Sequence, residues 1–93
     1  MTIFMVGYDE REGEDYTALI KALQGFSGWW HCLDSTWLIE SNMSAIQIRD
    51  HLWPNMHKGD KLLVLYYLPA KSGGQYAWQG FDKNCGEWLN NNL

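Results

Sequence analysis

Two unbroken apolar runs dominate the pattern of hydrophobic and polar positions. Thr2–Asp9 reads Thr-Ile-Phe-Met-Val-Gly-Tyr-Asp and closes on one carboxylate, and Leu62–Leu68 forms the second run. Short apolar runs bounded by turn residues are typical of strands that are covered on both faces. The pattern therefore predicts two buried strands. It also predicts that Asp9 points out of the sheet, where water or a ligand can reach it.

Helical periodicity follows each of two turn regions. Apolar residues recur at helical spacing over Tyr16–Leu23, and Gly25 is a natural stop after them. Ser44 and Gln47 match a capping box ahead of a second apolar stripe, which Pro54 ends. The sequence thus predicts two amphipathic helices.

The remaining segments predict strands and a short closing helix. Trp29–Asp34 and Thr36–Glu40 are rich in aromatic and β-branched residues and are separated by a tight polar step, which predicts a hairpin. Tyr76 and Trp78 alternate with less apolar neighbours, as on a strand with one apolar face. Asp82 is the expected cap of a final helix.

The order of these elements is β-α-β-β-α-β, which predicts an α+β, ferredoxin-like antiparallel sheet with an extra C-terminal strand and a short helix. A chain of 93 residues predicts a single domain, residues 1–93. Both long helices should cover one face of the sheet and leave the other bare. Because two strands are apolar on both faces, we expect a second copy to cover the bare face, as a two-fold homodimer packed sheet to sheet.

Composition narrows the classes of partner. The hydrophobic content of 46% indicates an ordered fold. The chain also has six Trp and five Tyr, so we expect some of these aromatic residues to lie in a groove or at an interface. A formal net charge of −4 with only seven Lys and Arg argues against broad, non-specific nucleic-acid binding. No apolar run approaches the roughly 20 residues that span a membrane. The start of the chain has no basic region typical of a signal peptide, so we expect a cytoplasmic protein that does not bind membranes.

The two cysteines, Cys32 and Cys85, lack CxxC spacing and zinc-finger histidines. Two buried, reduced thiols are the favoured interpretation, with a metal site or a disulfide as the alternatives.

Several local strings resemble a known group. They are similar to the small proteins labelled SinR-family, which have the fold of the smaller CRISPR adaptation subunit and of VapD-type toxins. The strings that carry the resemblance are Gly7-Tyr8-Asp9, Trp29-Trp30-His31, Ser35-Thr36-Trp37-Leu38-Ile39-Glu40, Asp60-Lys61-Leu62-Leu63-Val64 and Ala77-Trp78.

The resemblance implies a ferredoxin-like homodimer whose fifth strand reaches the partner's sheet. In the CRISPR and toxin relatives, the Asp that closes the first strand is proposed to hold a divalent metal for phosphodiester cleavage, a role that carries over only to Asp9. Two features depart from those relatives: Tyr16-Thr17-Ala18 stands in place of early arginines, and Leu38 in place of a Glu. Kinship at the level of the fold also suggests a setting in prokaryotic or phage defence or counter-defence.

Two functions follow as hypotheses. The first is a homodimeric, non-catalytic module that binds a partner protein or a small, nucleotide-like ligand, in a groove whose predicted residues are Tyr8, Trp29, Trp30, His31 and Ser35. The alternative is a metal-dependent ribonuclease or endonuclease in which paired Asp9 carboxylates bind Mg²⁺ at the dimer cleft. Each residue also has a structural explanation: core packing for the Trp pair, a hydrogen-bonded structural role for His31, and a turn or cap for Asp9. The acidic balance and the missing arginines favour the binding module.

Overall fold

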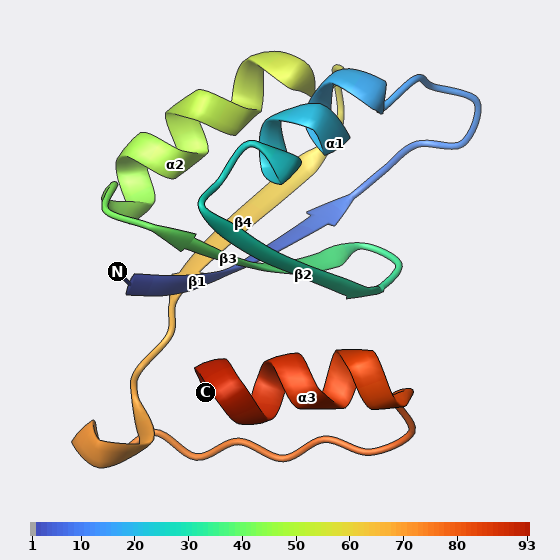
Figure 1. Cartoon of the computed structure of the whole chain (residues 1–93). Helices are drawn as coiled ribbons and strands as arrows, with labels where there is room; N and C mark the ends of the chain where they lie inside the picture. The colour runs from blue at the N-terminus through green and yellow to red at the C-terminus, as the bar shows by residue number, and fades with distance from the viewer. Residues whose placement is uncertain (1) are drawn as a thin grey trace.

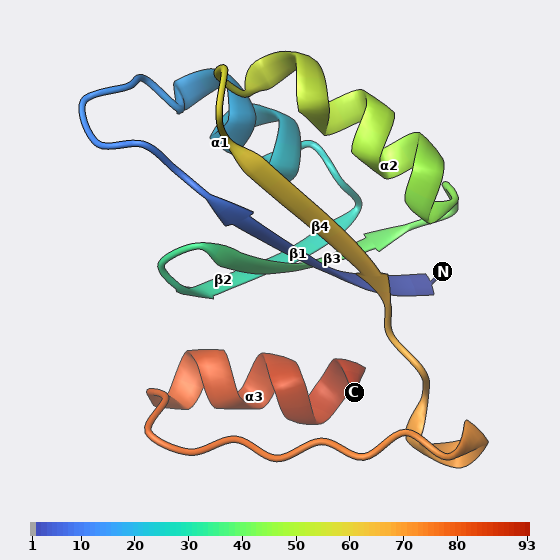
Figure 2. The same ribbon diagram turned by 180° about the vertical axis from the view of Figure 1, so that it is seen from behind.

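A four-stranded antiparallel sheet with strand order β2-β3-β1-β4 organises the molecule. The structure, a computed structural model, describes residues 2–93. Helices α1 and α2 cover one face of the sheet and α3 lies on the other (Figures 1 and 2). The elements are β1 (Thr2–Asp9), α1 (Thr17–Gln24), β2 (Gly28–Leu33), β3 (Thr36–Ser41), α2 (Ala45–Leu52), the 3₁₀ turn η1 (Trp53–Asn55), β4 (Lys61–Tyr66), the 3₁₀ turn η2 (Ala70–Ser72) and α3 (Lys83–Asn92).

The predicted β-α-β-β-α-β order and the C-terminal helix are confirmed. The capping box is also present: the Ser44 hydroxyl accepts the Gln47 N–H at 3.1 Å, and the Gln47 side chain accepts the Ser44 N–H at 2.9 Å. These two bonds satisfy donors that the first turn of α2 would otherwise leave unpaired. Asp82 caps α3 as expected, accepting the Cys85 N–H at 2.9 Å.

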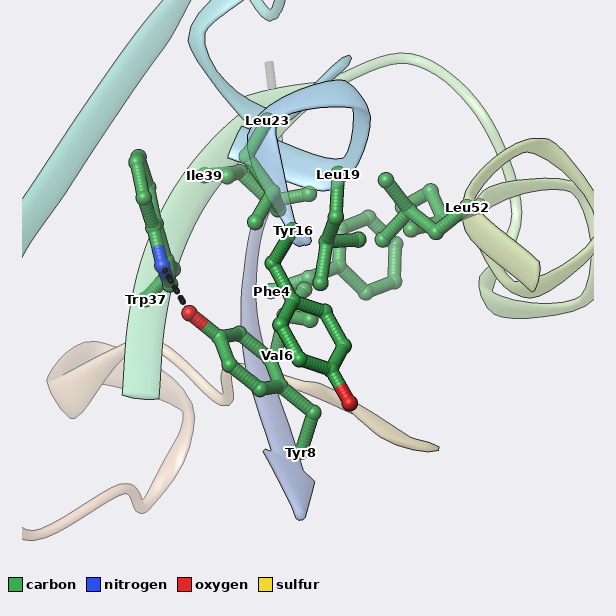
Figure 3. Packing of buried hydrophobic residues seen from close by; sticks show 10 residues of the cluster. Phe4, Val6, Tyr8, Tyr16, Leu19, Leu23, Trp37, Ile39 and Leu52 are labelled. Atoms are coloured by element: carbon green, nitrogen blue, oxygen red, sulfur yellow. Dashed lines mark hydrogen bonds between the residues drawn. The ribbon is translucent and has the colours of Figure 1, made fainter. Parts of the chain in front are cut away.

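The main core lies between the sheet and the two helices α1 and α2. Two of its aromatic members are joined by a hydrogen bond from the Trp37 indole N–H to the Tyr8 hydroxyl at 2.9 Å (Figure 3). This bond satisfies two polar atoms that would be costly to bury alone. Burial raises the pKa of Tyr8 above 10.0, so the phenol stays neutral across the physiological range. The fully buried side chains are Val6, Leu19, Leu23, Trp37, Ile39, Ile48 and Leu52.

The second face of the sheet is covered in part by the chain itself. Trp30 and Ile3 on the sheet and Leu89 on α3 are buried there. The Trp30 indole N–H donates to the Cys85 carbonyl at 3.1 Å, which ties β2 to α3. The expectation of a bare second face is therefore wrong, because α3 folds back over part of it. The homodimer stays a prediction.

A disulfide joins Cys32 on β2 to Cys85 on α3. The predicted reduced thiols are wrong, since the fold brings together two residues 53 positions apart. The cytoplasmic location stays a prediction, and the disulfide counts against it because cytosolic proteins rarely keep such bonds. Among residues 2–93, every helix falls short of the length and hydrophobicity that a membrane span requires.

The predicted fifth strand is absent from residues 74–81, which are irregular. This segment runs alongside α3 on the second face, away from both edges of the sheet (Figures 1 and 2). Its aromatic residues serve packing instead: Tyr76 stacks on Tyr67 with ring centroids 4.4 Å apart. A segment with an alternating pattern forms a strand only when it lies beside a sheet edge with which it can pair, and residues 74–81 lie away from both edges.

Candidate functional site

The five predicted ligand-binding residues do not line one groove. Tyr8, Trp29 and His31 lie with Trp37 on the face that α1 and α2 cover. Trp30 lies on the opposite face, under α3. Ser35 sits in the β2–β3 turn, where its carbonyl accepts the Tyr8 N–H at 3.1 Å.

His31 has a structural environment. Its ring stacks on Trp37 at a centroid distance of 3.9 Å and an interplanar angle of 12°, and its Nε2 lies 3.1 Å from the Asp34 carbonyl oxygen. Trp29 also packs on Trp37, at 5.3 Å, and is 41% exposed. Of this cluster, only Trp29 offers substantial open surface.

Asp9 is an open carboxylate at the end of β1. Its side chain is 77% exposed, and the Lys61 ammonium lies 4.0 Å away. Within residues 2–93 no three His, Cys, Asp or Glu side chains come together in a way that could hold a metal ion. The described part of the chain therefore gives Asp9 a cation as its charged partner and no three-ligand cluster.

The open edge of the sheet is β4, which pairs with β1 on one side and with no other strand of residues 2–93. Register fixes which backbone groups point outward. The Tyr67 N–H donates to the Ile3 carbonyl at 2.8 Å, and Leu65 and Leu63 stand opposite Met5 and Gly7 in the same register. Hydrogen-bonding direction alternates along an antiparallel strand. The N–H and C=O groups of Leu62, Val64 and Tyr66 therefore point away from β1, outward from the open edge and in the plane of the sheet.

The side chains on this edge are apolar on both faces. Leu63 and Leu65 lie on the α3 side and are 54% and 45% exposed, while Tyr66 on the other face is also exposed. From Leu62 to Tyr66 the strand has no charge, proline or glycine. Natural sheets usually blunt exposed edges with such residues or with bulges. We call this open strand, Leu62–Tyr66, the β4 edge.

Two hollows lie between the β4 edge and α2. One, of about 260 Å³, is lined by Ile46, Arg49 and β4 side chains, and the other, of about 420 Å³, by Trp53, Arg49 and the start of β4. Ile46 and Trp53 are exposed apolar residues at their rims. The charges here cancel in pairs, because Arg49 contacts Asp50 at 2.9 Å. The surface is apolar and nearly neutral, which suits a polypeptide better than a polyanion.

A buried carboxylate anchors the start of β4. Asp60 accepts the Tyr16 hydroxyl at 2.8 Å and the His57 backbone N–H at 2.7 Å, and the Arg11 guanidinium lies 3.9 Å away. Burial would raise the pKa of Asp60, but the hydrogen bonds and the nearby cation outweigh it and hold the pKa below 3.8. The network links Asp60 to α1 and fixes where the edge strand begins.

No role as a buried carboxylate was predicted for Asp60. Tyr16 carried a usable signal, because a tyrosine on the buried stripe of a helix needs an acceptor for its hydroxyl. His57 beside it is half-buried, and its Nε2 lies 2.7 Å from the Asp15 carbonyl oxygen.

The chain was compared with family models, curated proteins and solved structures, and none of them matches it. The geometry of the β4 edge therefore carries the functional argument.

Proposed function

We propose that this chain is a non-catalytic binding module with a ferredoxin-like fold, which binds an extended polypeptide segment as an added strand on β4. The observation that carries the proposal is the β4 edge: an unprotected strand whose outward backbone groups lie beside apolar hollows. The strand order and the placement of α1 and α2 on one face support the ferredoxin-like assignment.

Strand addition combines backbone and side-chain recognition. Three outward residues, Leu62, Val64 and Tyr66, each offer one N–H and one C=O to an incoming strand. The side chains of that strand would alternate between Leu63 and Leu65 on one face and the hollows beside α2 on the other. A segment with apolar residues on both faces and little charge fits this surface best.

Other ligand classes receive less support. The net charge of −4 and the paired cations disfavour a nucleic-acid backbone. The aromatic residues expected to stack on a nucleotide lie on opposite faces of the sheet. Asp9 belongs to no cluster of three possible metal ligands within residues 2–93, so we do not propose the nuclease.

Panning a display library of random peptides against the immobilised protein tests the proposal. We expect enriched peptides to be extended and apolar on both faces. They should bind Val64→Pro at least tenfold more weakly, because proline removes an outward donor without breaking the ladder to β1. Trp29→Ala, at the opposite edge, is the matched control and should bind them unchanged.

Two results would overturn the proposal. One is the absence of enriched peptides, and the other is equal binding to Val64→Pro and the unaltered protein. If the enriched peptides instead lose affinity for Trp29→Ala, the binding site lies at the cluster of Trp29, His31 and Trp37.

A further inference from the structure

We infer that the strand that pairs with β4 is β4 of a second copy, antiparallel and centred on Val64. This inference rests on the proposed function, because it names the occupant of the same edge. The outward backbone set of Leu62, Val64 and Tyr66 is symmetric about its middle residue. A two-fold axis at Val64 is therefore the one register that pairs all of these groups with their counterparts.

The backbone match is complete in this register. Val64 stands opposite Val64 of the second copy, and Leu62 stands opposite Tyr66, each as a hydrogen-bonded pair. The two four-stranded sheets then form one continuous sheet across the axis. No outward N–H or C=O of the β4 edge is left unpaired.

The side chains are self-complementary in the same register. Leu63 stands opposite Leu65 of the second copy, twice by symmetry, at non-hydrogen-bonded positions where side chains approach most closely. Lys61, the one charged residue of β4, stands opposite Tyr67 rather than another lysine. Leu63 and Leu65, which are half-exposed in one copy, are then covered by each other.

Helix α2 adds to the contact. It lies over β4 on one face of the sheet, so a two-fold axis through the Val64 pair, perpendicular to the sheet, sets the α2 helices of both copies on the same side. The exposed Ile46 and Trp53 line the hollows that the second copy would close. Arg49 and Asp50, paired in one copy, bring no net charge to the contact.

The opposite edge of the sheet does not pair in this way. Between Trp30 and Leu33 the register of β2 against β3 shifts by one residue, which is a bulge. Cys32 within this stretch is bonded to α3. Bulged edges resist strand addition, so assembly stops at two copies instead of growing into a fibre.

The contact is small. One six-residue strand with a few side chains of α2 falls in the class of interfaces below roughly 1,200 Å² in total, which are weak and transient. We therefore expect a dissociation constant in the micromolar range.

Sedimentation equilibrium of the full chain, from about 1 to about 500 µM, tests the inference across that range. Leu63→Lys should weaken dimerisation at least tenfold, because it places a charge against Leu65 of the second copy. Adding Leu65→Glu to Leu63→Lys should restore dimerisation, since each new cation then faces a new anion in this register. Leu33→Lys, which alters a residue of similar exposure at the β2 end, is the control and should dimerise like the unaltered chain.

Both altered positions on β4 are exposed, and circular dichroism should confirm that the variants fold. A chain that is monomeric at every concentration would overturn the inference, as would a double variant no better than Leu63→Lys. If the chain is monomeric while panned peptides still bind the β4 edge, the inference fails and the proposed function survives. If neither binds there, both fail.

Discussion

The two edges of one sheet are built differently. At the β2 edge, Trp30 is buried beneath α3 and Cys32 is covalently joined to it. At the β4 edge, all six residues keep an unbroken register with β1, and Leu63 and Leu65 remain half-exposed. An open sheet has two edges, and in this chain the C-terminal helix α3 is attached to the strand at one of them, β2. The edge that is left open is the one with the surface to bind another strand.

The bulge deepens the contrast. His31 and Cys32 together stand opposite the single residue Trp37, which bends β2 and interrupts its ladder. The bulge also carries Leu33 to the α3 side, where it lines the same hollow as Trp30. The β2 edge is thus locally irregular, whereas β4 is regularly paired along its whole length.

The largest expected effect comes from unequal burial at the two edges. Trp30→Ala should lower the free energy of unfolding by about 3–5 kcal/mol, because it removes a buried indole, its contact with Phe81 and its bond to Cys85. Leu65→Ala should cost less than about 1 kcal/mol, since Leu65 is 45% exposed. Urea denaturation of both variants measures the difference. Equal losses would show that the two edges are protected alike.

The disulfide gives the next effect. Replacing both cysteines by Cys32→Ser and Cys85→Ser should lower the free energy of unfolding by about 2–4 kcal/mol, because the bond closes a long loop and restricts the unfolded chain. The unaltered chain in excess reductant is the control and should lose a similar amount. A loss below about 0.5 kcal/mol in both would mean that α3 holds the β2 edge without covalent help.

Acid should give the smallest effect, and it should act on β4 first. The pKa of Asp60 is depressed in the folded state, so the unfolded chain takes up a proton more readily as the pH falls. The stability that Asp60 contributes is therefore present at neutral pH and is lost as the pH falls below 3.8 toward the folded pKa. Amide exchange should show the protection of Leu63 and Leu65 falling before that of β3.

Asp60→Asn is the matched variant for this experiment. It should reduce the acid dependence without removing it, because Thr17 also holds the pKa of Asp15 below 3.8 through hydrogen bonds. An unchanged acid profile would show that Asp60 does not anchor the edge strand.

Local patterns gave most of the secondary structure. The predicted run Thr2–Asp9 coincides with β1, and the capping box at Ser44 begins α2 where expected. These features depend on spacing within a few residues, so the sequence displays them directly. The alternating residues after Gly74 misled because their pattern does not reveal whether a sheet edge lies nearby.

Long-range features were not accessible in the same way. The disulfide and the packing of α3 depend on how a distant helix folds back over β2. The β4 edge was hidden for a related reason: the sequence shows an apolar strand, but only strand order and register show which backbone groups stay unpaired. The aromatic residues predicted to line one groove lie on both faces of the sheet, because side chains alternate along a strand: Trp30 faces α3, and Trp29 faces the opposite side.

The Cys32–Cys85 bond also sets the path of mechanical load. Tension applied between residues before Cys32 and residues after Cys85 passes through the sulfur bridge and bypasses the enclosed stretch, residues 33–84. That stretch contains β3, α2 and β4. The strand proposed to receive a partner is therefore in the portion of the chain that pulling on the flanking ends would strain least.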